Sequence, residues 1–311
     1  MQSPQKNSLQ AWLLATRPKT LTGAMIPVLF AGALAWYNGF HDTLPWILWT
    51  VCLLFACLMQ VAANLINDYF DFLKGTDRAD RLGPERACAM GWINPESMRR
   101  GISVVVALAC CVGLCAVLLA HPFLPWGGWE FVLIGTTCVI FAFLYTLGLS
   151  YLGYGDLLVL IFFGFIPVCG TYYLMTVSLP LETTLLSLIA GIAIDALLVI
   201  NNYRDRDQDR ISGKRTLAVR LGERFERYHY LAIGIIVACL IIVLHEQLES
   251  GSILSSILWY VTLCGYLCLH INTWRRMVRI YQGRALNAIL GETSRNMFVM
   301  ALFLCGAIIL S

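Results

Sequence analysis

Long apolar segments dominate this chain and limit what it can fold into. Crossing a bilayer takes about 20 apolar residues, and nine segments of this kind follow one another, at residues 20–38, 46–67, 101–120, 130–149, 154–177, 183–203, 229–245, 253–271 and 296–311. Only 13% of the residues are charged, against roughly 25% in a soluble domain. Backbone groups in lipid must be satisfied within their own segment, and the alternation of a membrane β-barrel is missing. The sequence therefore predicts an all-α polytopic membrane protein of about nine transmembrane helices, folded as one domain over residues 1–311.

The basic residues predict the orientation of the chain in the bilayer. With a cytoplasmic N-terminus, the outward connections contain no Lys or Arg; they are residues 39–45, 121–129, 178–182 and 246–252. All 22 Lys and Arg residues then lie on the cytoplasmic side, which is the positive-inside pattern. The C-terminus is expected outside. The net charge of +3 comes from the cytoplasmic connections and suggests neither nucleic acid nor an acidic partner. The apolar composition makes the lipid bilayer the expected surroundings of the chain.

Two clusters of Asn and Asp residues close apolar segments on the same predicted side of the membrane. They consist of Asn64, Asp68 and Asp71, and of Asn201, Asp205 and Asp209. Residues four and seven or eight apart share one face of a helix, so each cluster stacks oxygen ligands. Mg²⁺ prefers such ligands and is commonly held by one or two carboxylates together with substrate phosphates. The sequence predicts a diphosphate held through Mg²⁺, with Mn²⁺ as an alternative, between two clusters that face each other across a cavity.

Basic residues follow each cluster in two long cytoplasmic connections, at about residues 68–100 and 204–228. The residues predicted to contact the diphosphate are Lys74, Arg78, Arg81, Lys214 and Arg215. The same array would stabilise a diphosphate leaving group, because negative charge grows there as the C–O bond breaks. Charged helix ends also serve simply as solvated caps and membrane anchors. Two matching clusters on one side favour the binding site over that interpretation.

Other polar residues allow two interpretations each. Arg17 and Lys19 begin the first segment, either as membrane anchors or as contacts for an anionic substrate. Tyr145 and Asp156 bracket the one cytoplasmic connection without a basic residue, so a metal, a substrate or another loop would have to supply a partner for Asp156. Asp195 lies inside a predicted span, where a carboxylate is a functional candidate or a hydrogen-bonding partner of a neighbouring helix.

Five sequence strings resemble the UbiA superfamily of intramembrane aromatic prenyltransferases. NDYFDFLKGTDRADRLGPER and NNYRDRDQDRISGKRTLAVRLG resemble its two Asp-rich motifs, and RPKTL, YLGYGDLLVLIFFG and LNAILGETSR extend the likeness through nearly the whole chain. The likeness is strongest to the branch that prenylates 1,4-dihydroxy-2-naphthoate in menaquinone synthesis. One departure is Leu149, four residues after Tyr145, where some members have a diphosphate-binding Lys.

The resemblance implies nine helices around a central cavity, capped by the two connections. It assigns metal binding to Asn64, Asp68, Asp71, Asp77, Asn201, Asp205 and Asp209, and catalysis to the aspartates Asp68, Asp71, Asp205 and Asp209. Residues considered for the aromatic acceptor are Arg17, Lys19, Asn64, Tyr145 and Asp156. The implied reaction moves a polyprenyl chain from its diphosphate to 1,4-dihydroxy-2-naphthoate, with loss of diphosphate and CO₂, and yields demethylmenaquinol. The implied location is the bacterial inner membrane, with the active site on the cytoplasmic side.

Two alternatives remain at this stage. One is a prenyltransferase for another aromatic acceptor, such as 4-hydroxybenzoate or a naphthoate isomer. The other is an ion-coupled transporter, which would carry its polar residues near the bilayer midplane on broken helices. Since the carboxylates gather at cytoplasmic ends and only Asp195 lies well inside a span, the pattern favours the enzyme.

Overall fold

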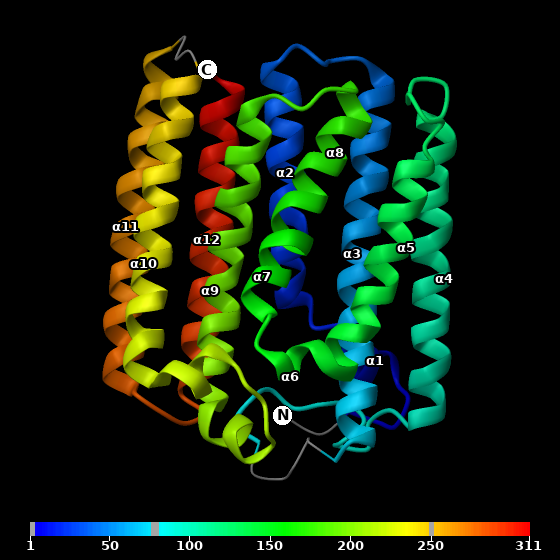
Figure 1. Cartoon of the computed structure of the whole chain (residues 1–311), viewed down its shortest axis with the longest axis vertical. Coiled ribbons are helices and arrows are strands. Elements are labelled where there is room, and N and C mark those ends of the chain that lie inside the picture. Colours follow the sequence, from blue (N-terminus) through cyan, green and yellow to red (C-terminus); the bar gives the residue numbers. More distant parts are fainter. Residues whose placement is uncertain (1–3, 76–80, 249–251) are drawn as a thin grey trace.

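The computed structural model describes residues 4–75, 81–248 and 252–311. All regular elements in these residues are helical, and nine helical stretches are long and apolar enough to cross a membrane. The predicted all-α polytopic fold is therefore confirmed. The segment α1 (Leu9–Ala15) lies at one end of the bundle and the C-terminus at the other (Figure 1), as an odd number of crossings requires. The cytoplasmic location of the N-terminus stays a prediction.

The helices follow one another along the chain, and the longest connection lies between α3 and α4. The first half contains the short 3₁₀ helix Pro18–Thr20, α2 (Leu21–Tyr37), α3 (Thr43–Leu73), α4 (Pro95–Ala120), α5 (Trp129–Leu144) and α6 (Ser150–Leu152). The second half contains α7 (Gly155–Val159), α8 (Ile166–Thr176), α9 (Leu181–Ile211), α10 (Leu217–Gln247), α11 (Ile253–Ile280) and α12 (Leu286–Ile309). Two π-helical segments, Tyr145–Leu149 and Leu160–Phe165, interrupt the spans that contain α5 and α8.

The two long connections are shorter than the sequence indicates. Helix α3 continues to Leu73 and α9 to Ile211, and α10 already begins at Leu217, with a break at Gly222 where φ is +83°. Hydropathy marks where lipid ends, whereas a helix keeps its own backbone hydrogen bonds and can continue into water. The second connection is therefore reduced mainly to residues 212–216, and the Asp-rich turns are helical.

Side-chain caps fix where several helices begin. Asn94 accepts a hydrogen bond from the backbone N–H of Ser97 at 2.7 Å, and Pro95 occupies the first position of α4. Thr216 and Ser252 cap α10 and α11 in the same way. Such caps satisfy N–H groups that have no partner within the helix. Asn94 thus fixes the first turn of α4.

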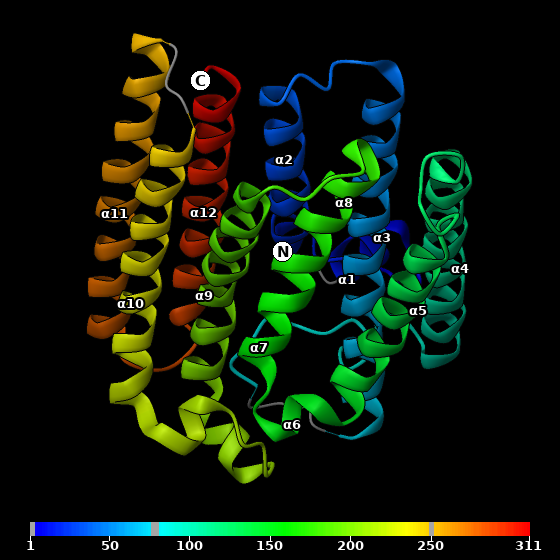
Figure 2. The same ribbon diagram turned by 45° about the horizontal axis from the view of Figure 1, so that its top comes forward.

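Helix α2 occupies the centre of the bundle and packs against α3, α8, α9 and α12. Helices α3, α4 and α5 lie on one side of it, and α9 to α12 form the other side (Figures 1 and 2). The π-helical segment Leu160–Phe165 packs closely on α9, where a side chain on Gly164 would come within 3.2 Å of the Cα of Gly191. Small residues allow such close backbone approach in membranes, and the cavity described below lies between the two sides.

Candidate active site

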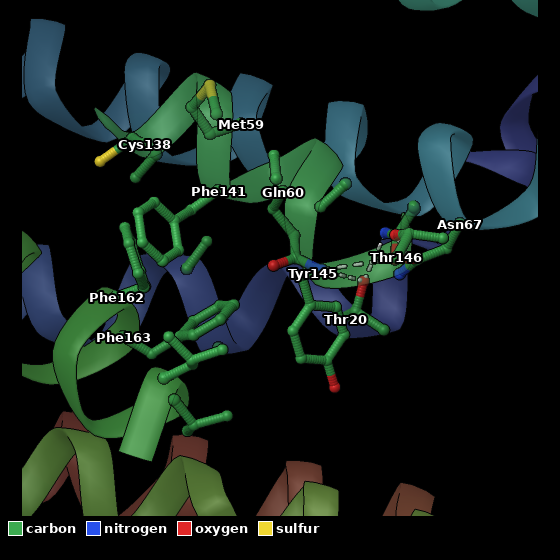
Figure 3. A pocket seen from close by; sticks show the side chains of 18 of the residues that line it. Thr20, Met59, Gln60, Asn67, Cys138, Phe141, Tyr145, Thr146, Phe162 and Phe163 are labelled. Atoms are coloured by element: carbon green, nitrogen blue, oxygen red, sulfur yellow. Dashed lines mark hydrogen bonds between the residues drawn. The ribbon is translucent and has the colours of Figure 1, made fainter. Parts of the chain in front are cut away.

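A cavity of about 1200 Å³ lies inside the helix bundle. Its larger part is apolar, with a lining that includes Phe55, Met59, Leu114, Phe131, Val139, Phe141, Phe162 and Phe163. Its other part is polar, with a lining that includes Arg17, Asn64, Asn67, Asp71, Arg81, Arg86, Asn201, Asn202, Arg204, Asp205, Gln208, Asp209 and Lys214. Figure 3 shows the aromatic side chains of Phe141, Phe162 and Phe163 grouped to one side of Tyr145 and the pair Asn67 and Thr146 to the other. The cavity therefore suits a ligand with a polar head and a long apolar body.

The end of α3 supplies one polar wall. The carboxylate of Asp71 lies 3.1 Å from the guanidinium of Arg86, which reaches back from the connection after α3. The amide oxygen of Asn67 accepts a hydrogen bond from the hydroxyl of Thr146 in the π-helical turn. Asn64, one turn earlier, donates to the hydroxyl of Thr20 at 2.8 Å. These hydrogen bonds join α3 to the π-helical turn at Thr146 and to the 3₁₀ helix at Thr20.

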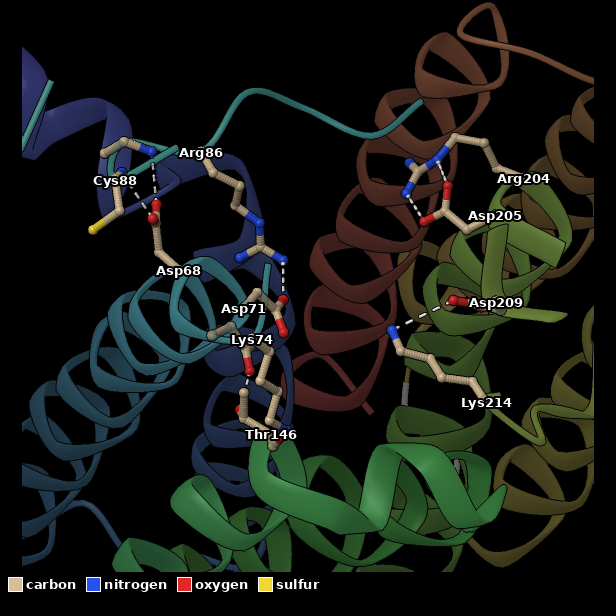
Figure 4. A network of polar contacts seen from close by, with 12 residues as sticks. Asp68, Asp71, Lys74, Arg86, Cys88, Thr146, Arg204, Asp205, Asp209 and Lys214 are labelled. Carbon is tan, nitrogen blue, oxygen red and sulfur yellow. Dashed lines mark hydrogen bonds and ion pairs between the residues drawn. The ribbon is translucent and has the colours of Figure 1, made fainter. Parts of the chain in front are cut away.

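The end of α9 supplies the opposite polar wall (Figure 4). Arg204 donates to both carboxylate oxygens of Asp205, at 2.7 and 2.6 Å, and to the amide oxygen of Asn287 on α12 at 2.7 Å. The carboxylate of Asp209 lies 3.4 Å from the ammonium group of Lys214. Each carboxylate of the cavity, Asp71 included, thus has a cation beside it. Negative and positive groups alternate around the polar end.

Asp68 does not belong to the cavity lining. It is 1% exposed, and its two oxygens accept hydrogen bonds from the backbone N–H groups of Ala87 and Cys88, at 2.8 and 3.0 Å. The structure instead brings Asn67 and Asp71 to the cavity, with the same four-residue step as Asn201 and Asp205. The pair on α3 that corresponds to Asn201 and Asp205 is therefore Asn67 and Asp71. The sequence had suggested Asn64 and Asp68 instead.

The five predicted diphosphate contacts differ in position. Arg81 and Lys214 line the cavity. Lys74 donates instead to the carbonyl oxygens of Thr146 and Leu147, at 2.7 and 3.0 Å, and so holds the π-helical turn in place. Arg215 lies outside the lining, with its backbone N–H bonded to the carbonyl of Tyr151. Arg78 lies outside the described residues.

The predicted metal and acceptor residues are also divided. Asp77 lies outside the described part of the chain, whereas Asn201, Asp205 and Asp209 line the cavity. Of the acceptor candidates, the lining contains Arg17, Asn64 and Tyr145. Lys19 is exposed and lies outside it. Asp156 faces a separate small pocket behind Tyr145.

Five residues of the polar end were missed by the sequence interpretation, namely Asn67, Arg86, Asn202, Arg204 and Gln208. Arg86 and Arg204 line the cavity and are 8% and 3% exposed, and Asn67 lies beside Thr146. One signal was available for Asn67: Asn67 and Asp71 repeat the spacing of Asn201 and Asp205. The position of Arg86 could not be read from spacing, because it depends on the path of the connection after α3.

The arrangement of helices is shared with solved structures. A UbiA homolog from Archaeoglobus fulgidus, solved bound to DMAPP and Mg²⁺, has the same fold with a TM-score of 0.62, 13% sequence identity, and coverage of 96% of this chain and 98% of that one. The sequence pattern of the UbiA prenyltransferase family matches residues 24–308. The chain belongs to the UbiA prenyltransferase family. The predictions of the family and of a prenyl-transferring enzyme are thereby confirmed, and the transporter interpretation falls.

Two relatives within the UbiA family carry the same enzyme name. The 1,4-dihydroxy-2-naphthoate octaprenyltransferase of Escherichia coli K12 is 41% identical over 74% of this chain and 74% of its own length. The enzyme of the same name from Mycobacterium tuberculosis H37Rv is 32% identical over 97% of each chain. The likeness to this branch of the UbiA family thus extends over nearly the whole sequence.

Proposed function

We propose that this UbiA family member transfers a polyprenyl chain from a polyprenyl diphosphate to 1,4-dihydroxy-2-naphthoate, releasing diphosphate and CO₂ and forming demethylmenaquinol. The observation that carries the proposal is the division of the cavity. Two Asn–Asp pairs and a set of buried cations occupy one end, and an apolar chamber continues from it. A prenyl diphosphate has this same division between head and tail. The names of the relatives from E. coli and M. tuberculosis support the choice of acceptor.

The donor set at the polar end fits Mg²⁺. We assign the metal to the carboxylates of Asp71, Asp205 and Asp209, helped by the amides of Asn67 and Asn201, because these are hard oxygen ligands. When bound, Mg²⁺ would neutralise diphosphate charge and turn the repulsion between carboxylates and phosphate into attraction. We leave Asp68 out of this set, since both of its oxygens are already engaged by the chain.

The basic residues of the cavity bind and hold the diphosphate. Arg86, Arg204 and Lys214 each lie beside a carboxylate of the polar end, which holds them where the diphosphate would bind. Arginine offers paired N–H donors that match phosphate oxygens. These cations would favour heterolysis of the C–O bond, whose electron pair leaves with the diphosphate.

The acceptor completes the reaction beside Tyr145. The allylic cation left by heterolysis is attacked by the naphthoate carbon that carries the carboxylate, and a C–C bond forms. The electron pair of the bond to the carboxyl group then restores the aromatic ring as CO₂ leaves. We assign the acceptor carboxylate to Arg17, a cation of the lining that is not among the proposed diphosphate contacts. The apolar wall excludes water, which would otherwise capture the cation.

A product assay tests this function. The full-length protein, purified and reconstituted in lipid nanodiscs, is given a polyprenyl diphosphate, Mg²⁺ and one acceptor at a time, and products are identified by mass spectrometry. Demethylmenaquinol from 1,4-dihydroxy-2-naphthoate, with loss of activity in EDTA and recovery with Mg²⁺ or Mn²⁺, is the expected result. A prenylated 4-hydroxybenzoate with no naphthoate product would reject the acceptor and keep the prenyl transfer. We also propose a bacterial cell membrane location with the polar end facing the cytoplasm, supported by the Lys and Arg distribution.

A further inference from the structure

A second cluster of acidic groups lies beside the cavity, where α7, α9 and α10 meet. Asp156 begins α7, Asp195 lies in the middle of α9, and His229 and Glu226 lie one turn apart on α10. One ligand atom from each of Asp156, Asp195 and His229 lies within 4.8 Å of the other two. None of these four residues belongs to the lining of the central cavity, so the proposed function does not use them.

The cluster carries more negative charge than its surroundings balance. The charged neighbours of Asp195 are Asp156, Glu226 and His229. Asp195 is 7% exposed, and its Oδ1 has no hydrogen-bond partner; Glu226 is fully buried, and neither of its oxygens accepts a hydrogen bond. An isolated carboxylate removed from water costs a great deal of free energy unless a cation or a proton compensates it. Three acidic side chains around one imidazole therefore require either a bound cation or protons.

We propose that Asp156, Asp195 and His229 bind a divalent transition-metal ion, separate from the Mg²⁺ of the diphosphate site. Ligand atoms bonded to such an ion at about 2.0–2.2 Å are at most roughly 4.4 Å apart, so the observed cluster needs only a small contraction. An imidazole ligand disfavours Mg²⁺ and Ca²⁺, which take oxygen, and favours ions such as Zn²⁺. The divalent cation would offset the charges of its two carboxylate ligands, and the third acidic group, Glu226, faces Nδ1 of His229.

The position of Glu226 agrees with this assignment. His229 directs Nε2 toward Asp195, at 3.8 Å from Oδ2, and Nδ1 toward Glu226, at 3.4 Å from Oε2. A carboxylate behind a metal-binding histidine commonly holds the far N–H and thereby selects the nitrogen that faces the metal. A small rotation of the imidazole on metal binding would bring the Nδ1–H of His229 into a hydrogen bond with Glu226, which makes Glu226 a positioning residue and leaves Nε2 for the ion.

The ion would connect three helices next to the active site. Asp156 also lines a small pocket of about 50 Å³ together with Tyr145, Asn202 and Asp209, which line the central cavity as well. Asp195 lies on α9, the helix that carries Asp205. The metal would therefore fix both the wall behind Tyr145 and the helix that presents the second Asn–Asp pair.

The proposed site can be tested by measuring how much metal the protein binds in the absence of prenyl diphosphate. This measurement does not depend on enzymatic activity. Untagged full-length protein in detergent is stripped with EDTA, incubated with Zn²⁺ in excess Mg²⁺, passed through gel filtration and analysed by mass spectrometry of the elements. We expect one Zn²⁺ per chain in the wild type and a loss of that Zn²⁺ in Asp195→Asn. In Glu226→Gln we expect a roughly 10- to 100-fold weaker affinity for Zn²⁺, the usual effect of removing a carboxylate that holds a metal-binding histidine. The matched control Asp205→Asn, on the same helix, should retain Zn²⁺.

Electron spin-echo measurements on wild-type protein loaded with Mn²⁺ supply a test that needs no variant. A ¹⁴N coupling from imidazole is expected, because the diphosphate site offers oxygen ligands from its aspartates and asparagines. Absence of retained metal and of ¹⁴N coupling in the wild type would overturn the proposal and leave the cluster as protonated carboxyl groups. Loss of Zn²⁺ in Asp205→Asn but not in Asp195→Asn would overturn it too, since the ion would then belong to the diphosphate site.

Discussion

The carboxylate of Asp68 accepts a hydrogen bond from the backbone N–H of Cys88 at 3.0 Å, and this bond ties the end of α3 to the connection that follows it. The neighbouring N–H of Ala87 bonds to the other oxygen. Through these bonds the connection is held where Arg86 can reach Asp71. Two aspartates of one motif, three residues apart, therefore have different tasks.

Asp68→Ala and Asp71→Ala are expected to differ in kind. Asp68→Ala leaves two buried N–H groups without an acceptor, each costing about 1–3 kcal/mol, so thermal stability in detergent should fall clearly. Asp71→Ala removes a proposed metal ligand and should lower kcat/KM on the order of 10²-fold or more, with a smaller fall in thermal stability, because Arg86 keeps its place in the polar lining of the cavity. Thermal unfolding and steady-state kinetics on both proteins measure the contrast. Equal losses of stability in the two variants would contradict the division.

Arg204→Lys should weaken the use of the prenyl diphosphate. Lysine cannot hold both oxygens of Asp205 and the amide of Asn287 at once, as Arg204 does, and hydrogen bonds to charged groups are worth about 1.5–3 kcal/mol. We expect kcat/KM for the prenyl diphosphate to fall roughly 10- to 100-fold. Arg206→Lys is the matched control, because Arg206 is on the same helix, outside the cavity lining, and pairs with Glu223. An equal kinetic effect in both variants would argue against the role of Arg204.

Arg17→Ala should raise the KM of the naphthoate more than the KM of the prenyl diphosphate. Arg17 lines the cavity, whereas Lys19, two residues later, is exposed and outside it. Loss of a charged contact to a carboxylate should cost about 1.5–3 kcal/mol of acceptor binding. Separate titrations of the two substrates decide the point, with Lys19→Ala expected to behave like wild type. If Arg17→Ala affects only the diphosphate substrate, Arg17 belongs to the diphosphate-binding set.

A bulky side chain at Gly135 should shorten the prenyl chain that the enzyme accepts. Gly135 on α5 lines the cavity, and a Cβ there meets nothing within 4 Å, so Gly135→Phe would extend into the chamber. We expect turnover of a long polyprenyl diphosphate to fall more than that of geranyl diphosphate. Gly265→Phe, at a helical glycine of α11 with equal open space outside the cavity lining, controls for the substitution itself. Unchanged chain-length selectivity in Gly135→Phe would refute the placement of the tail.

The C-terminus is expected on the outer side of the membrane. The confinement of Lys and Arg to alternate connections places the N-terminus in the cytoplasm, and an odd number of spans places the C-terminus on the opposite side. Fusions of a periplasmic reporter and a cytoplasmic reporter after Ser311 measure the location. Activity of the cytoplasmic reporter alone would reverse the predicted orientation.

The sequence by itself determined the class of the protein. Nine apolar segments were enough for the membrane fold, because backbone groups in lipid have no partner other than their own helix. The Asn201 and Asp205 pair, and the carboxylate chemistry it indicates, were also readable, since helical spacing alone places these residues on one face.

Only the tertiary structure decided which side chains of each cluster meet in the cavity. Asp68 and Asp71 are three residues apart on α3, and this spacing does not say which of them faces the cavity. In the folded protein Asp71 lines the cavity, whereas Asp68 accepts hydrogen bonds from the backbone of Ala87 and Cys88. Arg86 reaches the site because the connection after α3 folds back. Asp156, Asp195 and His229 come together from three helices that are far apart in the sequence. Such contacts depend on the rotation and approach of whole helices, which local sequence patterns do not encode.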